Sequence, residues 1–305
     1  MEELNKTSTA SNAVLFSEHA DAFETPSSRF GQFRETLTSV PVIAALAILA
    51  LIALIGLLAP FLWTSDPLAI NPRLRLRPES LAHWMGTDGF GRDMYSRVLY
   101  GARISLFVGL GVAVVSVALG LLIGLMAGYF RVLDAIIMRI MDGLMAIPGI
   151  LLAIALVTLS GASLLTVVVA IAVPDIPRVV RLVRSVILTV RTEPYVEAAT
   201  ALGTPTLLIL VRHMAPNTVA PLIVQGTFVF ASAMLTEAGM SFLGVGLPPE
   251  IPSWGNIMAE GRTFFQLKPG LILYPGLLLA LTVLSVNILG DALRDALDPR
   301  LAKRL

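Results

Sequence analysis

The chain has 305 residues, of which 56% are hydrophobic and only 14% are charged. Soluble domains carry about 25% charged residues, so this composition excludes a soluble or disordered protein and predicts an integral membrane protein. The formal net charge of +1 gives no reason to expect nucleic acid as a partner, and the absence of cysteine excludes disulfides, Cys-based zinc sites and thiol nucleophiles.

The predicted organisation begins with a polar segment, residues 1–39. We interpret it as a flexible cytoplasmic tail, because it lacks the basic start and the apolar stretch of a secretory signal. Residues 40–63 contain no charged side chain, and a helix of this length crosses a hydrocarbon core of about 30 Å. They form the predicted first span, and the polar residues 64–103 follow as a predicted extracytoplasmic loop.

A core domain, residues 104–292, is predicted to hold five further spans, at residues 104–129, 145–159, 164–186, 219–243 and 271–289. The short break at residues 160–163 predicts a tight hairpin between the third and fourth spans. In the second span, Gly120, Gly124 and Gly128 are four residues apart and share one helical face. Small residues let membrane helices approach closely, so we expect this face to pack against another helix.

Six spans place both termini on the same side of the membrane, and the distribution of Arg and Lys indicates which side. With the N-terminus inside, fourteen Arg and Lys fall on the cytoplasmic side and eight outside, which favours cytoplasmic termini. Residues 293–305 are then a cytoplasmic C-terminal tail. Asp291, Arg294, Asp295 and Asp298 are spaced to form ion pairs one helical turn apart.

The motifs of several enzyme classes are missing. The sequence has no G-x-x-x-x-G-K-[ST] loop for nucleotide phosphates, no H-E-x-x-H metal motif and no G-x-S-x-G nucleophile elbow. We therefore predict no catalytic residue, cofactor site or metal site in this chain. A transporter, a channel and a receptor remain as function classes.

Two acidic residues lie inside predicted spans. Asp175 stands between Pro174 and Pro177, and a charge at the membrane centre costs about 2.5–3.5 kcal/mol on insertion scales, so it should face a cavity or a partner. Asp175 either lines a pathway and contacts a cationic substrate group, or pairs with Arg178 one turn away. For Glu237 we favour a structural hydrogen bond, with pathway lining near the outer mouth as the alternative.

The loop between the fourth and fifth spans, residues 187–217, is the most informative. Pro194 suits the first turn of a short helix, and Gly203 suits the position just past its end. The helical spacing places three residues on one face: Tyr195, Ala199 and Leu202.

A second helix is predicted to follow at once. Thr204 fits its N-cap and Pro205 its first position, and we expect it to end at Pro216. The loop then forms a compact projection on the cytoplasmic side. An ordinary helical connector between two spans is the alternative interpretation.

The same loop resembles the EAA loop of ABC importer permeases, because Glu197-Ala198-Ala199-x-x-x-Gly203 is followed after nine residues by a block ending in Pro216. The block usually reads I-x-L-P in that family, whereas residues 213–216 read H-M-A-P here. Residues 212–217, R-H-M-A-P-N, are nevertheless similar to the R-H-I-L-P-N of C-type permeases of dipeptide, oligopeptide and nickel importers.

Further blocks resemble this subfamily in the same order, over residues 83–301. Residues 83–93 read H-W-M-G-T-D-G-F-G-R-D, which is similar to its H-x-x-G-T-D-x-x-G-R-D. Three later blocks also match, at residues 241–246 (S-F-L-G-V-G), 252–256 (P-S-W-G-N) and 290–300 (G-D-A-L-R-D-A-L-D-P-R).

The resemblance implies an all-α membrane protein with six transmembrane helices and the type I ABC importer permease fold, in a bacterial inner membrane. Such a chain is half of a translocation pathway. Its partners would be a B-type permease beside it in the lipid bilayer, two ATPase subunits on the cytoplasmic side and an extracytoplasmic substrate-binding protein. ATP and Mg belong to the ATPase subunits, so the resemblance implies that this chain binds no cofactor and is not itself an enzyme.

The resemblance also assigns a coupling helix between spans four and five, which would dock in a groove of one ATPase subunit and move with it as a rigid body. The residues assigned to this contact are Tyr195, Glu197, Ala198, Ala199, Leu202 and Gly203. Gly203 would set the helix angle in a left-handed conformation. Glu197 would pair with Arg191 or Arg212 of its own loop, or with the ATPase, and a solvated carboxylate is the alternative.

Asp88, Arg92 and Asp93 would lie outside, near the start of the second span. Opposite charges at this density predict a folded, ion-paired extracytoplasmic motif with a structural role. Contact with the binding protein is the alternative.

The expected cargo is small peptides, with glutathione or a nickel complex as the alternative for the same type of importer. A self-sufficient secondary transporter would need an internal repeat with broken helices in both halves. A scaffold or receptor would signal through residues 192–216. ATP dependence of uptake separates the importer from both.

Overall fold

The computed structural model describes residues 38–297, and among these residues it contains helices and connecting segments without a strand. The longer helices are α3 (Val40–Leu58), α4 (Met94–Tyr129), α7 (Leu164–Val190), α10 (Val219–Phe242) and α12 (Gly270–Leu297). The shorter ones are α5 (Arg131–Met145), α6 (Gly149–Ser160), α8 (Pro194–Ala201) and α11 (Trp254–Gly261).

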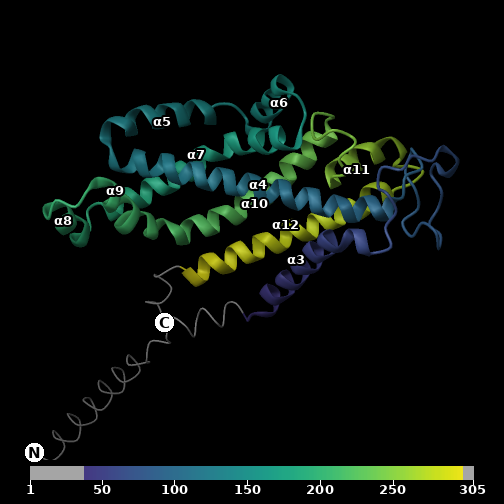
Figure 1. Cartoon of the computed structure of the whole chain (residues 1–305), viewed down its shortest axis with the longest axis horizontal. Helices are drawn as coiled ribbons and strands as arrows, with labels where there is room; N and C mark the ends of the chain where they lie inside the picture. Colours follow the sequence, from purple (N-terminus) through teal and green to yellow (C-terminus); the bar gives the residue numbers. More distant parts are fainter. Residues whose placement is uncertain (1–37, 298–305) are drawn as a thin grey trace, which may run out of the picture.

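The long helices form a bundle with two different ends. Figure 1 shows α4, α7, α10 and α12 lying side by side, with α8 at one end of the bundle. At the other end lie α11 and residues 62–93, the segment that connects α3 to α4. We call these the α8 end and the α11 end. Of the two predicted tails, residues 1–37 and 298–305 lie outside the described residues, and residues 293–297 continue α12.

Four helical stretches in the described part of the chain are long and apolar enough to cross a membrane: residues 40–61, 94–129, 206–242 and 270–297. They contain nearly all of the predicted first, second, fifth and sixth spans. The second stretch begins ten residues early because Asp93 caps it. The Asp93 carboxylate accepts hydrogen bonds from the Ser96 backbone N–H (2.8 Å) and hydroxyl (2.6 Å).

The prediction of a single third span at residues 145–159 is wrong. α5 ends at Met145, α6 begins at Gly149, and the two helices meet at 90°. Pro148 lies at the break, where it lacks the N–H of a continuing helix and restricts the residue before it. α6 has 12 residues, or about 18 Å, so a crossing here needs both helices as one broken span.

The predicted fourth span is covered by α7, but Asp175 lies near the middle of this helix and three arginines follow in its second half. By length and composition, residues 38–297 therefore hold four candidate spans, or five if the α5–α6 pair is one broken span, and these criteria do not confirm the predicted six. The predicted hairpin is present, since α6 packs on α7. The Ser163 hydroxyl caps α7 by accepting from the Thr166 N–H at 3.1 Å.

The predicted packing face of the second span is confirmed. Three glycines of α4 face three branched residues of α7 at the same spacing: Gly120, Gly124 and Gly128 against Val179, Val183 and Ile187. A methyl group on Gly124 would lie 2.6 Å from Val183 Cβ, which is closer than packed carbon atoms approach. The glycines therefore set the distance between α4 and α7.

The second helix of the 187–217 loop differs from its prediction. It begins at Thr206, and Pro216 does not end it, because a π-helical stretch (Ile209–Met214) and a 3-10 turn (Ala215–Thr218) lead into α10. The wider and tighter turns accommodate a proline that offers no N–H to the preceding turn. The result is one continuous helical stretch, residues 206–242.

Among the ion pairs predicted near the C-terminus, those within the described residues are absent, and Asp298 lies outside the described residues. Asp291, Arg294 and Asp295 lie on α12, but no ion pair joins them to one another. Asp291 and Arg294 are exposed, so their charges are solvated instead.

Candidate functional site

α8 stands at one end of the bundle, as Figure 1 shows. Pro194 occupies its first position, and Gly203 follows its end with φ +75°. This left-handed conformation costs roughly 1 kcal/mol for a residue with a Cβ. The N–H groups of Gly203 and Thr204 donate to the carbonyls of Thr200 (3.0 Å) and Ala199 (3.1 Å), which closes the helix end.

The two faces of α8 differ. Val196 and Ala199 are buried against the 206–214 stretch, whereas the outer residues are exposed: Tyr195, Glu197, Ala198 and Leu202. Of the three residues predicted to share one helical face, Ala199 is therefore buried while Tyr195 and Leu202 are exposed. Leu202, with 86% of its surface exposed, follows the last residue of the helix. Val196 and Ala199, which are three residues apart, are the two that turn inward.

Glu197 makes no ion pair with Arg191 or Arg212 in the described structure. It lines an open cleft of about 580 Å³ together with Tyr129 and Arg191, at the junction of α8 with the ends of α4 and α7. Arg191 donates to the Tyr129 carbonyl at 3.3 Å. Of the expected partners for Glu197, a group on another subunit remains.

Tyr195 connects α8 to the helix that follows. The Asn217 side-chain amide donates to the Tyr195 hydroxyl (3.2 Å) and to the His213 carbonyl (2.7 Å). The loop is thus one folded unit. Asn217 was not among the predicted site residues, although it closes the R-H-M-A-P-N block.

A second polar region lies along α5 and α7. Two carboxylates of α5 pair with two arginines of α7, Asp134 with Arg184 (2.5 and 2.7 Å) and Asp142 with Arg181 (2.5 Å). Asp175 is 7% exposed, and its carboxylate lies 3.4 Å from Arg178. The predicted i, i+3 pair is therefore present.

Glu237 is buried in the described chain at 1% exposure, near the end of α10. Its Oε1 atom accepts hydrogen bonds from Ser241 and Ser253, each at 2.8 Å. Ser253 is also the N-cap of α11, where its hydroxyl accepts from the Asn256 N–H. The carboxyl group therefore joins α10 to α11, as a structural role requires.

At the α11 end, a buried ion network surrounds Asp88. Its Oδ2 atom contacts Arg92 Nε (2.6 Å) and Arg97 Nη1 (2.9 Å), and both arginines also contact Glu260 of α11. Arg97 is fully buried. Burial raises the pKa of the Glu260 carboxyl to about 7, and Arg92 offsets part of this rise.

Asp93 belongs to the same loop but has other partners. One carboxylate oxygen lies 2.9 Å from His83 Nδ1, and the other caps α4. The structure therefore unites Asp88 and Arg92, while Asp93 anchors the helix start. Arg97 and Glu260 were missed by sequence reasoning. An arginine in the first turn of a long apolar helix was the signal for Arg97, and Glu260 offered none.

Comparison with known proteins decides the family. Residues 95–303 match the family described as the inner membrane component of binding-protein-dependent transport systems. The chain belongs to this family of permeases. This permease is 54% identical over 247 residues to a probable peptide ABC transporter permease protein of Sinorhizobium fredii, covering 81% of this chain and 85% of the relative.

Two further relatives are similar over most of their length. A dipeptide transport system permease of Alkalihalophilus pseudofirmus is 44% identical over 246 residues, covering 80% of the permease and 81% of the relative. A glutathione transport system permease of Pectobacterium atrosepticum is 44% identical over 230 residues, covering 75% and 76%. α8 and the α5–α7 region both lie inside the matched residues.

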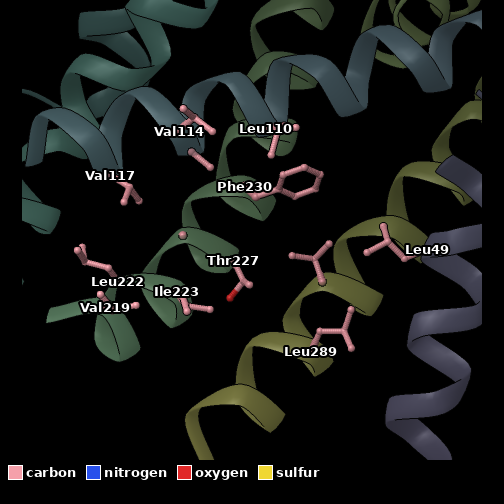
Figure 2. Close-up of a pocket in the computed structure, with 13 residues that line it drawn as sticks. Leu49, Leu110, Val114, Val117, Val219, Leu222, Ile223, Thr227, Phe230 and Leu289 are labelled. Carbon is pink, nitrogen blue, oxygen red and sulfur yellow. The ribbon is translucent and has the colours of Figure 1, made fainter. Parts of the chain in front are cut away.

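The permease also contains an apolar pocket of about 620 Å³ between α3, α4, α10 and α12. Figure 2 shows Phe230 and Thr227 of α10 facing Leu289 of α12, with Leu49 of α3 beyond. Thr227 carries the single hydroxyl in the lining. A charged solute would lose its water here without gaining hydrogen bonds, so this pocket does not suit a polar cargo.

Proposed function

We propose that this permease forms half of the translocation pathway of an ATP-driven importer for small peptides. Relatives at 44–54% identity are named as peptide, dipeptide and glutathione permeases, and glutathione is itself a tripeptide. Import of glutathione or of a nickel complex through the same type of complex is the alternative. No phosphate-binding loop occurs in the sequence, so the energy source lies in partner subunits.

The observation that carries this proposal is the α8 unit. It is a short helix at the end of the bundle, closed by Gly203 in a left-handed conformation, with Glu197 exposed and without an intrachain ion pair in the described residues. We infer that α8 is the coupling helix and docks on one of two ATPase subunits, which bind ATP and Mg. The docking residues are Tyr195, Glu197, Ala198 and Leu202, with Ala199 and Gly203 holding the helix in place.

We further propose that the chain crosses the membrane six times. Supporting this, α3, α5 and α10 run towards the α11 end and α4, α7 and α12 run back (Figure 1), so the α5–α6 pair and α7 count as spans three and four. Both termini and the α8 end are then cytoplasmic. The charged side of α7 faces a B-type permease across the pathway, since charges are not stable against lipid.

At the opposite, extracytoplasmic end, we propose structural roles for the charged motif and for Glu237. Asp88 and Arg92 bind the loop to α11, and Asp93 starts α4. Glu237 fixes α10 to α11 through Ser253. These contacts give a folded outer surface above which a substrate-binding protein can deliver its cargo.

The test uses the whole complex, expressed with its partner subunits, purified in mild detergent and returned to vesicles. Mg-ATP hydrolysis and uptake of a radiolabelled dipeptide are measured together with the binding protein. Glu197→Arg reverses the charge on the docking side of α8, and we expect it to lower both activities about tenfold or more, as loss of a charge-assisted contact does. Glu193→Arg, also exposed but preceding α8, is the matched control and should change them little.

Two outcomes would contradict the proposal. One is a folded chain that purifies without any ATPase and still transports dipeptide in response to an ion gradient, which would make it a secondary transporter. The other is equal loss of activity in Glu193→Arg and Glu197→Arg, which would indicate general damage to the loop instead of a docking contact.

A further inference from the structure

Arg178 is an exposed charge in an unusual place. It lies near the middle of α7, and 61% of its side chain is exposed. α7 packs along α4 and α10, two of the stretches able to cross the membrane, so Arg178 lies at the depth of the apolar helices. A guanidinium facing lipid there costs about 2.5–3.5 kcal/mol or more, and this side of α7 must therefore face water or protein.

The neighbouring arginines of α7 are already neutralised by α5. Arg181 and Arg184 each have an oxygen of an α5 aspartate at 2.5 Å. Arg178 has one oxygen of Asp175 at 3.4 Å, from its own helix. A guanidinium carries five N–H donors, so most donors of Arg178 are unused in the described structure.

Asp175 cannot present its own charge to a solute. Its side chain is 10% exposed and lies behind the exposed arginine. The exposed charge at this point of α7 is the Arg178 guanidinium, because Asp175 is buried and Arg181 and Arg184 are paired with α5. A carboxylate therefore suits this face better than the cationic group considered for Asp175 from sequence.

We propose that Arg178 binds the terminal carboxylate of a peptide during its passage, and that Asp175 is the positioning residue that orients the guanidinium. A carboxylate accepts two parallel N–H bonds from a guanidinium, which gives both strength and orientation. The inference rests on the proposed peptide transport, and it names one contact of that pathway. It also gives Asp175 a part in the pathway without requiring its exposure.

The absence of cysteine in the chain permits a sharp test. In the vesicle-reconstituted complex, Arg178→Cys is expected to lower dipeptide uptake about tenfold or more, as expected for loss of a hydrogen bond to a charged group. A methanethiosulfonate reagent carrying an ammonium group should restore uptake, and one carrying a sulfonate should not. Dipeptide should slow the labelling of the introduced thiol. Arg181→Cys, one turn away and paired with Asp142 in the native chain, is the matched control, and dipeptide should not slow the labelling of its thiol.

Asp175 is tested through Arg178. Asp175→Asn should raise the dipeptide concentration needed for half-maximal uptake while preserving the maximal rate. Asp175→Glu keeps the carboxylate, so the concentration for half-maximal uptake should stay near that of the native chain. Adding Asp175→Asn to Arg178→Cys should cause no further loss, because a positioning residue has no effect without the group it orients.

The inference is overturned if the thiol in Arg178→Cys does not react in the assembled complex. It is also overturned if uptake is unchanged, or if both reagents restore it equally. Failure of the proposed function looks different, because the native complex would then show no ATP-dependent dipeptide uptake at all.

Discussion

Gly203 is a single residue whose backbone conformation determines where α8 ends. Gly203→Val should weaken coupling, because a β-branched residue at φ +75° is strained although nothing lies within 4 Å of the added Cβ. We expect a cost of about 1–2 kcal/mol at the helix end, and dipeptide uptake per ATP hydrolysed should fall. The measurement is that ratio in vesicles. Gly143→Val, equally uncrowded but without the left-handed conformation, should leave the ratio unchanged.

Glu260 predicts a pH dependence of stability. Burial raises its pKa from an ordinary 4.5 to about 7, so the folded state retains a proton that the unfolded chain has already lost. This contribution is complete below about pH 4.5 and is lost as the pH rises through 7. The melting temperature of the purified complex should therefore fall between about pH 5.5 and pH 8 by a few °C.

The control for this prediction is a pair of neutral variants. Glu260→Gln should remove most of the pH-dependent fall, and Glu250→Gln, at an exposed glutamate, should retain it. Equal falls in the native protein and in Glu260→Gln would assign the pH effect to another group. The charged groups around Glu260 are Arg92, Arg97 and Asp88.

At the scale of elements, the contact between α4 and α7 depends on the three glycines of α4 that share one helical face. Gly124→Leu should prevent it, because even the first carbon of the new side chain would lie 2.6 Å from Val183 Cβ. Overpacking of this kind costs about 1–3 kcal/mol or more, and we expect less folded protein in the membrane and a lower melting temperature. Gly226→Ala, whose Cβ would lie 3.6 Å from Val117, should be tolerated. A normal yield of Gly124→Leu would contradict this packing.

The apolar spans, the α6–α7 hairpin and the glycine face could be predicted from sequence because each depends on local composition or spacing. The broken third span could not, since residues 145–159 read as continuously apolar and the turn depends on how Pro148 is accommodated. Pro216 was predicted to end a helix, but the helical stretch continues through it, because the neighbouring π and 3-10 turns accommodate the proline. Propensity alone does not say which of these two solutions a proline takes.

The candidate site divides in the same way. Gly203 and the i, i+3 pair of Asp175 with Arg178 follow from neighbouring residues, so the sequence suffices. The contacts of Arg92 and Arg97 with Glu260 depend on the tertiary fold, because Glu260 lies 168 residues from Arg92. The burial of Ala199 also depends on a tertiary contact, with the helix that follows α8. Such long-range pairs leave no mark in a single sequence.

For the whole molecule, the six-span proposal predicts which loops face each side of the membrane. Single cysteines can be placed in this cysteine-free chain at three exposed positions: Leu81, Ala162 and Leu202. In intact cells an impermeant thiol reagent should label Leu81→Cys and Ala162→Cys from outside. Leu202→Cys should react only after the membrane is opened. Labelling of Ala162→Cys solely after opening would mean that α5–α6 and α7 do not cross.

The continuous helix from Thr206 to Phe242 has a mechanical consequence. Its 37 residues span roughly 55 Å at 1.5 Å per residue, so one continuous helical stretch reaches from the α8 unit to the residues around Glu237. A tilt of about 10° about its midpoint would carry each end about 5 Å in opposite directions, by the geometry of a rod of this length. A closing movement at the ATPase side would then become an opening movement at the far side, because the two ends of the helical stretch move in opposite directions.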